Sequence, residues 1–196
     1  MIIIESHIKG LIFDCDGTLA NTMPLHYLAW EETMQAHQAH FPETLFYELA
    51  GVPSDKIVMR LNELFGYQLD PKGIAEQKEM TFFKKYLPQT QPIEPVVAIA
   101  RRYKGQLPLA VATGGIANIA LGVLEAIGLG DFFETVVTAD DVIHGKPAPD
   151  IFLEAARRIG VAPAYCQVFE DSDLGLVGAL KAGMVATDIR PWHPLS

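Results

Sequence analysis

Two aspartates, Asp14 and Asp16, directly follow the apolar run Leu-Ile-Phe at residues 11–13. Such a run is expected to form a buried strand, and carboxylates at its end are costly to bury unless a cation lies beside them. Their spacing of two residues sends both side chains to the same face of extended backbone. Gly17 then permits a sharp turn and lets a ligand approach the backbone. The pattern therefore predicts a site with a metal ion, a lysine or both.

Polar residues also follow three later segments that read as strands. Thr113-Gly114-Gly115 follows the segment 108–113, Asp140-Asp141 follows 135–138, and Glu170-Asp171 follows 167–169. Lys146 lies in the loop after the strand at 135–138, between a glycine and a proline. Ligands of open parallel sheets bind beyond the carboxyl ends of the strands, so we expect these residues to form one site.

The order of the elements indicates a doubly wound parallel α/β sheet. Predicted strands alternate with predicted helices at 95–104, 117–127, 149–159 and 174–182, and a last strand spans 185–189. The segment before this region contains four predicted helices and no convincing strand, with the helices at 24–38, 42–49, 54–64 and 71–87. We therefore expect a Rossmann-like core, residues 1–18 and 92–196, that carries a small α-helical cap, residues 19–91.

Composition narrows the possible functions. The chain has 196 residues, 49% of them hydrophobic, and a net charge of -9, which argues against nucleic-acid or membrane-surface binding. Its two cysteines, Cys15 and Cys166, have no zinc-binding spacing, and we expect both to be reduced. We expect no signal peptide, because residues 1–5 contain no basic residue, and no apolar run in the sequence approaches membrane-spanning length. We expect a cytoplasmic monomer.

The polar clusters resemble, in order and spacing, the four motifs of the haloacid dehalogenase superfamily of phosphotransferases. The first motif corresponds to residues 14–18 (DCDGT), the second to Thr113, the third to Lys146 within residues 145–150, and the fourth to residues 169–172 (FEDS). The branch that the chain most resembles is the β-phosphoglucomutase-like one, which includes small sugar phosphatases such as fructose-1-phosphatase. That branch carries a helical cap at the position of residues 19–91. The resemblance implies that the partner of the protein is a small phosphorylated metabolite.

The resemblance implies a role for each acidic residue. Asp14 would be the nucleophile that forms an aspartyl-phosphate and would also bind Mg²⁺. Asp16 would protonate the leaving alcohol and later activate water, while its backbone carbonyl contacts the metal. Asp171 would be a direct metal ligand, and Glu170 would act through water or as a neighbouring acid. Mg²⁺ suits this set because it prefers hard oxygen ligands.

The same resemblance assigns the phosphate contacts. Lys146 would place a positive charge on the phosphate oxygens, and Thr113 would offer its hydroxyl. The backbone amides of Gly114 and Gly115 would donate to the same oxygens. Each residue also has an ordinary interpretation, since Thr113 could cap the next helix and Lys146 could be a surface lysine. The four motifs together favour the functional one.

Other conspicuous residues have simpler interpretations. Asp140 and Asp141 are expected to cap or shape their loop. His37 and His40 are expected to face solvent, because two histidines at this spacing do not make a zinc site without further ligands. The aromatic residues Phe82, Phe83 and Tyr86 are expected to pack in the core of the cap.

The cap carries the candidate substrate-binding residues. His26 falls where related enzymes place a histidine near the acid/base aspartate, Gly51 could bring the cap backbone close to the substrate, and Lys78 could reach a distal phosphate or hydroxyl. Ser54 stands where the mutases have an arginine that holds a second phosphate, which favours hydrolysis. Three functions remain open: a sugar phosphatase, with fructose 1-phosphate as a candidate substrate, a hexose-phosphate mutase, and a noncatalytic phosphate-binding protein.

Overall fold

A five-stranded parallel sheet organises the chain. The computed structural model describes residues 2–193, and the strands run in the order β3-β2-β1-β4-β5. Central β1 pairs with β2 and β4, so that Leu11 lies opposite Leu109 and Gln167. The predicted parallel α/β sheet is confirmed. The strands are β1 (Gly10–Phe13), β2 (Leu109–Ala112), β3 (Thr135–Val137), β4 (Cys166–Glu170) and β5 (Val185–Asp188).

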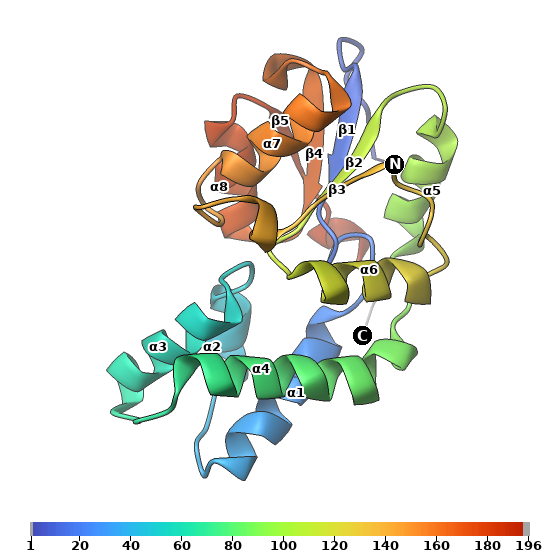
Figure 1. The fold of residues 1–196 in the computed structure, drawn as a ribbon. Helices are drawn as coiled ribbons and strands as arrows, with labels where there is room; N and C mark the ends of the chain where they lie inside the picture. The colour runs from blue at the N-terminus through green and yellow to red at the C-terminus, as the bar shows by residue number, and fades with distance from the viewer. Residues whose placement is uncertain (1, 194–196) are drawn as a thin grey trace.

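Helices cover both faces of this sheet (Figure 1). Helices α5 (Glu94–Tyr103) and α6 (Ala117–Ala126) pack on one face, where Leu11 and Phe13 point, and Phe13 stacks on Phe169 with ring centroids 4.7 Å apart. Helices α7 (Asp150–Ile159) and α8 (Asp173–Lys181) pack on the other face, against Ile12. A strand covered on both faces needs apolar residues at every position, which explains the uninterrupted apolar run before Asp14.

The helical cap has a core of its own. Its helices are α1 (Met23–Ala36), α2 (Glu43–Glu48), α3 (Ser54–Phe65) and α4 (Pro71–Thr81). Trp30, Phe41, Phe46 and Leu61 are buried among them and do not belong to either apolar layer of the sheet. In Figure 1 the four helices lie beyond the carboxyl ends of the strands. The cap therefore faces the edge at which the polar residues were predicted to meet.

The chain enters and leaves the cap through two adjacent segments. The amide of Asn21 donates to the carbonyl of Gln91, and the amide of Ile93 donates to the carbonyl of Leu19, both at 2.8 Å. The division into a core of residues 1–18 and 92–196 and a cap of residues 19–91 stays our interpretation.

The structure departs from the predicted elements mainly at the end of α4. The expected continuous helix 71–87 ends as an α-helix at Thr81, continues as a π-helical turn, Phe82–Tyr86, and closes with the 3₁₀ turn Leu87–Gln89. A π-turn holds one more residue than an α-turn and so rotates the following side chains. Phe82 and Tyr86 are buried, but in the apolar layer that contains Leu11 and Phe13, and Phe83 is exposed. The prediction that these three aromatic residues pack in the core of the cap was therefore wrong.

The other helices begin and end within two residues of their predicted bounds. Short 3₁₀ turns occur at Ala139–Asp141, Pro163–Tyr165 and Arg190–Trp192. Cys15 and Cys166 are buried free thiols, as expected. Within residues 2–193, no helix combines the length and the apolar character needed to cross a membrane.

Candidate active site

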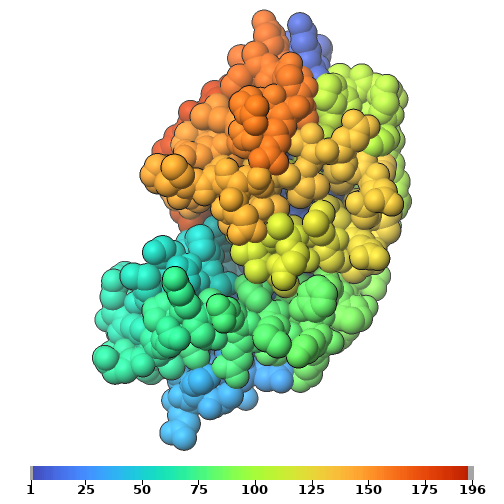
Figure 2. Space-filling view, in the orientation of Figure 1, coloured from blue at the N-terminus to red at the C-terminus, as the bar shows by residue number. Residues whose placement is uncertain are grey.

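A cavity of about 880 Å³ lies between the carboxyl edge of the sheet and the cap. In Figure 2 the surface is hollowed where the teal residues of the cap meet the yellow and orange residues of the core. All eleven predicted site residues line this cavity, although they come from separate strand ends and cap helices. They are Asp14, Asp16, His26, Gly51, Lys78, Thr113, Gly114, Gly115, Lys146, Glu170 and Asp171.

Lys146 joins two carboxylates at the floor of the cavity. Its Nζ donates to Asp14 Oδ1 and to Glu170 Oε2, each at 2.6 Å, and its side chain is 2% exposed. Burial alone would lower the pKa of Lys146, but the charges of Asp14 and Glu170 outweigh burial and raise it. The lysine is thus a fixed positive charge. Burial and the neighbouring Glu170 raise the pKa of Asp14, against the opposing effect of Lys146.

Asp14, Glu170 and Asp171 form a cluster of three carboxylates. Each offers an oxygen within 4.8 Å of the others. Burial and the charge of Glu170 raise the pKa of Asp171 to about 7, although Thr18 Oγ1 donates to its Oδ1 at 3.2 Å. Since Lys146 neutralises only one of the three charges, the cluster has surplus negative charge that a divalent cation would balance. Hard oxygen donors of this kind suit Mg²⁺.

The carboxylate of Asp16 lies apart from this cluster. Its side chain instead contacts Thr22 and His26. The expected contact between the Asp16 backbone carbonyl and the metal stays a prediction.

Two glycines make room for the acidic cluster. Gly17 has φ of +84°, and a Cβ atom there would lie 2.1 Å from Asp171 Oδ2. Gly175, in the first turn of α8, is equally crowded, since a Cβ atom would lie 2.1 Å from Glu170 Cδ. Ser172 caps α8 by accepting from the Gly175 amide, and its hydroxyl donates to Glu170 Oε1 at 2.7 Å. Gly175 was missed from the sequence, although a glycine early in a helix after two acids was an available signal.

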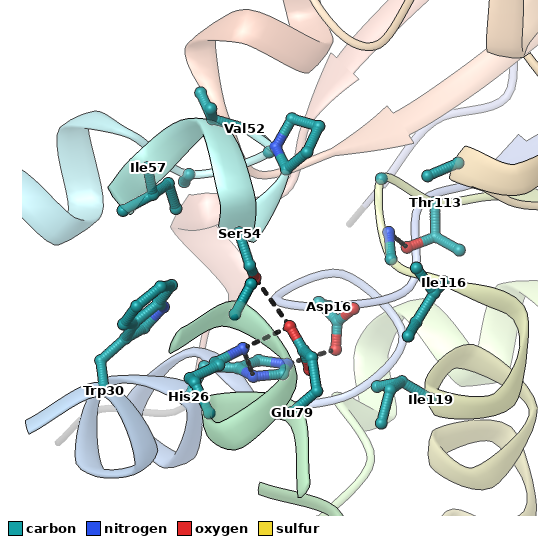
Figure 3. A pocket seen from close by; sticks show the side chains of 18 of the residues that line it. Asp16, His26, Trp30, Val52, Ser54, Ile57, Glu79, Thr113, Ile116 and Ile119 are labelled. Carbon is teal, nitrogen blue, oxygen red and sulfur yellow. Dashed lines mark hydrogen bonds and ion pairs between the residues drawn. The ribbon is translucent and has the colours of Figure 1, made fainter. Parts of the chain in front are cut away.

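Hydrogen bonds hold Asp16 as an anion (Figure 3). Its Oδ1 accepts from Thr22 Oγ1 at 2.7 Å and contacts His26 Nε2 at 3.2 Å. Lys78 Nζ lies 2.9 Å from His26 Nδ1. Because lysine can only donate, His26 Nδ1 must accept, and Nε2 therefore carries the proton that Asp16 receives as a hydrogen bond. Burial would raise the pKa of Asp16, but the hydrogen bonds from His26 and Thr22 and the charge of Lys78 lower it.

Packing in the cap fixes the orientation of His26. Its ring stacks on Phe82 with centroids 3.8 Å apart and planes 17° apart. Lys78 is 5% exposed in its side chain and lies over the rings of Trp30 and Phe82, 5.5 and 5.7 Å from their centroids. Instead of standing free for a distal phosphate, Lys78 is held by His26 and by Glu79 Oε1, the latter at 3.0 Å.

The loop after β2 forms the opposite wall. Thr113 is buried, and its Oγ1 accepts from the amide of Gly115 at 3.1 Å, so this amide is occupied in the structure. Thr113 does not cap α6, because Asp140 Oδ2 accepts from the Ala117 amide at 2.9 Å. Asp141 completes a capping box with Thr138. The expectation that Asp140 and Asp141 cap and shape their loop is confirmed.

Gly51 brings the cap backbone against the core. It has φ of +85°, and a Cβ atom there would lie 3.7 Å from Lys146 Cδ. A Cβ atom on Gly114 would lie 3.1 Å from the Gly51 carbonyl oxygen, so the two glycines permit this close approach. His37 and His40 are exposed as expected.

Three residues on the cap side of the site were not predicted from the sequence to belong to it. Thr22 and Glu79 take part in its hydrogen bonds, and the exposed Phe83 lines the cavity. Each owes its place to the packing of the cap helices.

The chain is similar to known proteins in sequence and in fold. The fructose-1-phosphate phosphatase YqaB of Escherichia coli (strain K12) is 40% identical over 181 residues, which cover 92% of this chain and 96% of that protein. The beta-phosphoglucomutase of Bacillus subtilis (strain 168) is 26% identical, with 95% and 85% of the two chains covered. The crystal structure of a hydrolase from Pseudomonas syringae superimposes with a TM-score of 0.83 at 25% identity, over 92% of this chain and 84% of that one.

A family model described as haloacid dehalogenase-like hydrolase matches residues 8–183. The chain therefore belongs to the haloacid dehalogenase-like hydrolases.

Proposed function

We propose that the protein is a Mg²⁺-dependent phosphatase that hydrolyses a small sugar phosphate, with fructose 1-phosphate as the first candidate. One observation carries the proposal. Asp14, which is paired with Lys146, lines the same cavity as Asp16, the candidate acid and base. The similarity to a fructose-1-phosphate phosphatase over nearly the whole chain supports the substrate class.

In the proposed reaction, a carboxylate oxygen of Asp14 attacks the phosphorus, and the bond from phosphorus to the sugar oxygen breaks. Asp16 gives its proton to the leaving oxygen, which departs as an alcohol. A water molecule then gives a proton back to Asp16 and attacks the phosphorus, which releases inorganic phosphate and restores the Asp14 carboxylate. Lys146 and Thr113 would hold the phosphate oxygens through both steps. Asp14 and Asp171 would hold Mg²⁺, with Glu170 acting through water or as a neighbouring acid. The bound ion would reduce the repulsion between the Asp14 carboxylate and the phosphate.

The state of Asp16 bears on the order of these steps. The hydrogen bonds from Thr22 and His26 favour its carboxylate form. This form is the base that the second step requires, whereas the first step requires Asp16 to take up a proton before the phosphorus–oxygen bond breaks. His26 would act as a positioning residue that keeps Asp16 directed into the cavity.

The cap would set the choice of substrate and would exclude water from the phosphorylated nucleophile. We keep the cytoplasmic location, the monomeric state and the absence of nucleic-acid and membrane partners that the sequence led us to expect.

A hexose-phosphate mutase is the second candidate, because a beta-phosphoglucomutase is among the relatives. Ser54 in place of an arginine favours hydrolysis, since no fixed fork of donors is present there to retain a bisphosphate.

A phosphate-release screen over sugar monophosphates, with Mg²⁺ and with EDTA, tests the proposal. We expect Mg²⁺-dependent phosphate release from fructose 1-phosphate or a related compound. Isomerised sugar phosphate formed only in the presence of a bisphosphate primer would identify a mutase. If no substrate yields either inorganic phosphate or an isomerised sugar phosphate, the result contradicts an enzymatic role.

A further inference from the structure

We infer that Glu79 is a specificity-determining residue: its carboxylate accepts a hydrogen bond from a hydroxyl at the end of the substrate remote from the phosphate, and it rejects substrates whose remote end is anionic. The inference rests on the proposed phosphatase function and narrows its substrate class. It predicts monophosphates of neutral polyols and sugars as substrates, and it disfavours bisphosphates and phosphorylated sugar acids.

Two donors fix one oxygen of Glu79. Ser54 Oγ donates to Glu79 Oε1 at 2.7 Å, and Lys78 Nζ lies 3.0 Å from the same atom. Within residues 2–193, Oε2 receives no hydrogen bond, and the side chain as a whole is 20% exposed. Figure 3 shows Glu79 beside Ser54 and His26, with its carboxylate directed toward Ser54. One oxygen is thus held by the protein, and the other is an acceptor open to a ligand.

Glu79 is an anion despite its burial. Burial would raise its pKa, but the charge of Lys78, the neighbouring His26 and the Ser54 hydrogen bond outweigh burial and lower the pKa below its ordinary value. A carboxylate in this state accepts strongly from a hydroxyl group. It cannot donate to a second phosphate or carboxylate, and it repels either one.

The remaining charges in the cavity leave a remote anion without a partner. Both buried lysines of the cavity wall already have acidic partners: Lys146 contacts Asp14 and Glu170, and Lys78 contacts Glu79. The other lysines that line the cavity, Lys72 and Lys84, are exposed. Among the described residues, no buried cation stands free to receive a second anionic group.

The variant Glu79→Gln replaces the open acceptor with a donor. Lys78 can only donate, so the side-chain oxygen of the introduced glutamine must stay on the Lys78 and Ser54 side, and its NH₂ group then takes the place of Oε2. The variant therefore removes the negative charge, loses the acceptor for a hydroxyl and gains a donor for an anion. A residue with a purely structural role would lower activity on every substrate by the same factor.

The test compares two substrates that differ only at the remote end: glucitol 6-phosphate, which ends in CH₂OH, and 6-phosphogluconate, which ends in a carboxylate. We measure kcat/KM for phosphate release with Mg²⁺ and take the ratio of the two values. We expect the wild type to prefer glucitol 6-phosphate, and Glu79→Gln to lower that ratio about tenfold or more. Ser54→Ala, which keeps the charge but frees the carboxylate, should lower the ratio less.

The matched control is Glu48→Gln, which makes the same change at an exposed residue of α2 that does not line the cavity. It should leave the ratio unchanged, and melting temperatures establish that each variant is folded. A ratio that stays constant in Glu79→Gln, with the wild type active, overturns the inference alone. No phosphate release by the wild type from either compound or from fructose 1-phosphate overturns the proposed function and the inference together.

Discussion

Replacing Asp171 with asparagine should stabilise the metal-free protein and abolish its stabilisation by Mg²⁺. The change keeps the shape of the side chain and removes one charge from a cluster in which Lys146 balances only one of three carboxylates. The oxygen that accepts from Thr18 can be retained, because asparagine also has a carbonyl oxygen. The variant thus isolates the cost of the surplus charge.

The magnitude follows from the pKa of Asp171, which burial and Glu170 raise from 3.8 to about 7. The folded state therefore binds the proton more tightly than the unfolded state, so stability is lost as the pH rises from about 4 to about 7. At 1.36 kcal/mol for each unit of pKa, the loss of unfolding free energy amounts to as much as about 4 kcal/mol at pH 8. Asp171→Asn escapes this loss, and its advantage over the wild type should grow by about 2 to 3 kcal/mol between pH 5 and pH 8.

Mg²⁺ should reverse the comparison. A ligand that binds only the folded state at 100 times its dissociation constant adds about 2.7 kcal/mol of stability. The wild type should gain this stability at pH 8, and the variant should not, since it lacks one of the proposed metal ligands. Urea unfolding followed by circular dichroism, at pH 5 and pH 8 with EDTA or Mg²⁺, measures both effects.

The exposed Asp131 provides the control, because Asp131→Asn makes the same change away from the cavity and should alter neither quantity. If Asp171→Asn is less stable than the wild type at pH 8 in EDTA, the cluster has no surplus charge to relieve. Equal stabilisation of both proteins by Mg²⁺ would place the metal elsewhere.

Three further substitutions test other parts of the site. Asp14→Asn should abolish phosphate release while the protein stays folded, as activity assays and circular dichroism would show; turnover at the wild-type rate would refute its role as nucleophile. Lys146→Ala should cost about 3 to 5 kcal/mol of unfolding free energy in urea, because it leaves the buried Asp14 and Glu170 without their cation; unchanged stability would show that the pair is solvated. Gly175→Ala should cost more than about 2 kcal/mol, since its Cβ atom would lie 2.1 Å from Glu170 Cδ, and a normal melting temperature would contradict that crowding.

The core of the site could be predicted because its position follows from topology. Asp14, Thr113 and Glu170 follow or end strands whose apolar runs are readable in the sequence, and parallel pairing brings those ends to one edge. Lys146 could be assigned to the same edge from its loop. The sheet itself requires only alternation of apolar strands with amphipathic helices.

The cap side of the site could not be predicted in the same detail, because it depends on how the helices pack. Lys78 reaches His26 across 52 residues of sequence, and this contact requires α1 and α4 to lie side by side. The π-turn after Thr81 leaves Phe83 exposed, which a regular helical period does not anticipate. Glu79 resembles any helical glutamate until Ser54 is placed beside it.

The most direct test of the central claim is to look for the phosphorylated nucleophile. The protein is mixed with fructose 1-phosphate and Mg²⁺, quenched in acid within the first turnover, and analysed by mass spectrometry of the intact chain and of its peptides. We predict the added mass of one phosphoryl group on the peptide that contains Asp14, and no such mass in Asp14→Asn or in EDTA. Rapid phosphate release without any phosphorylated chain, or phosphorylation of another residue, would contradict the account.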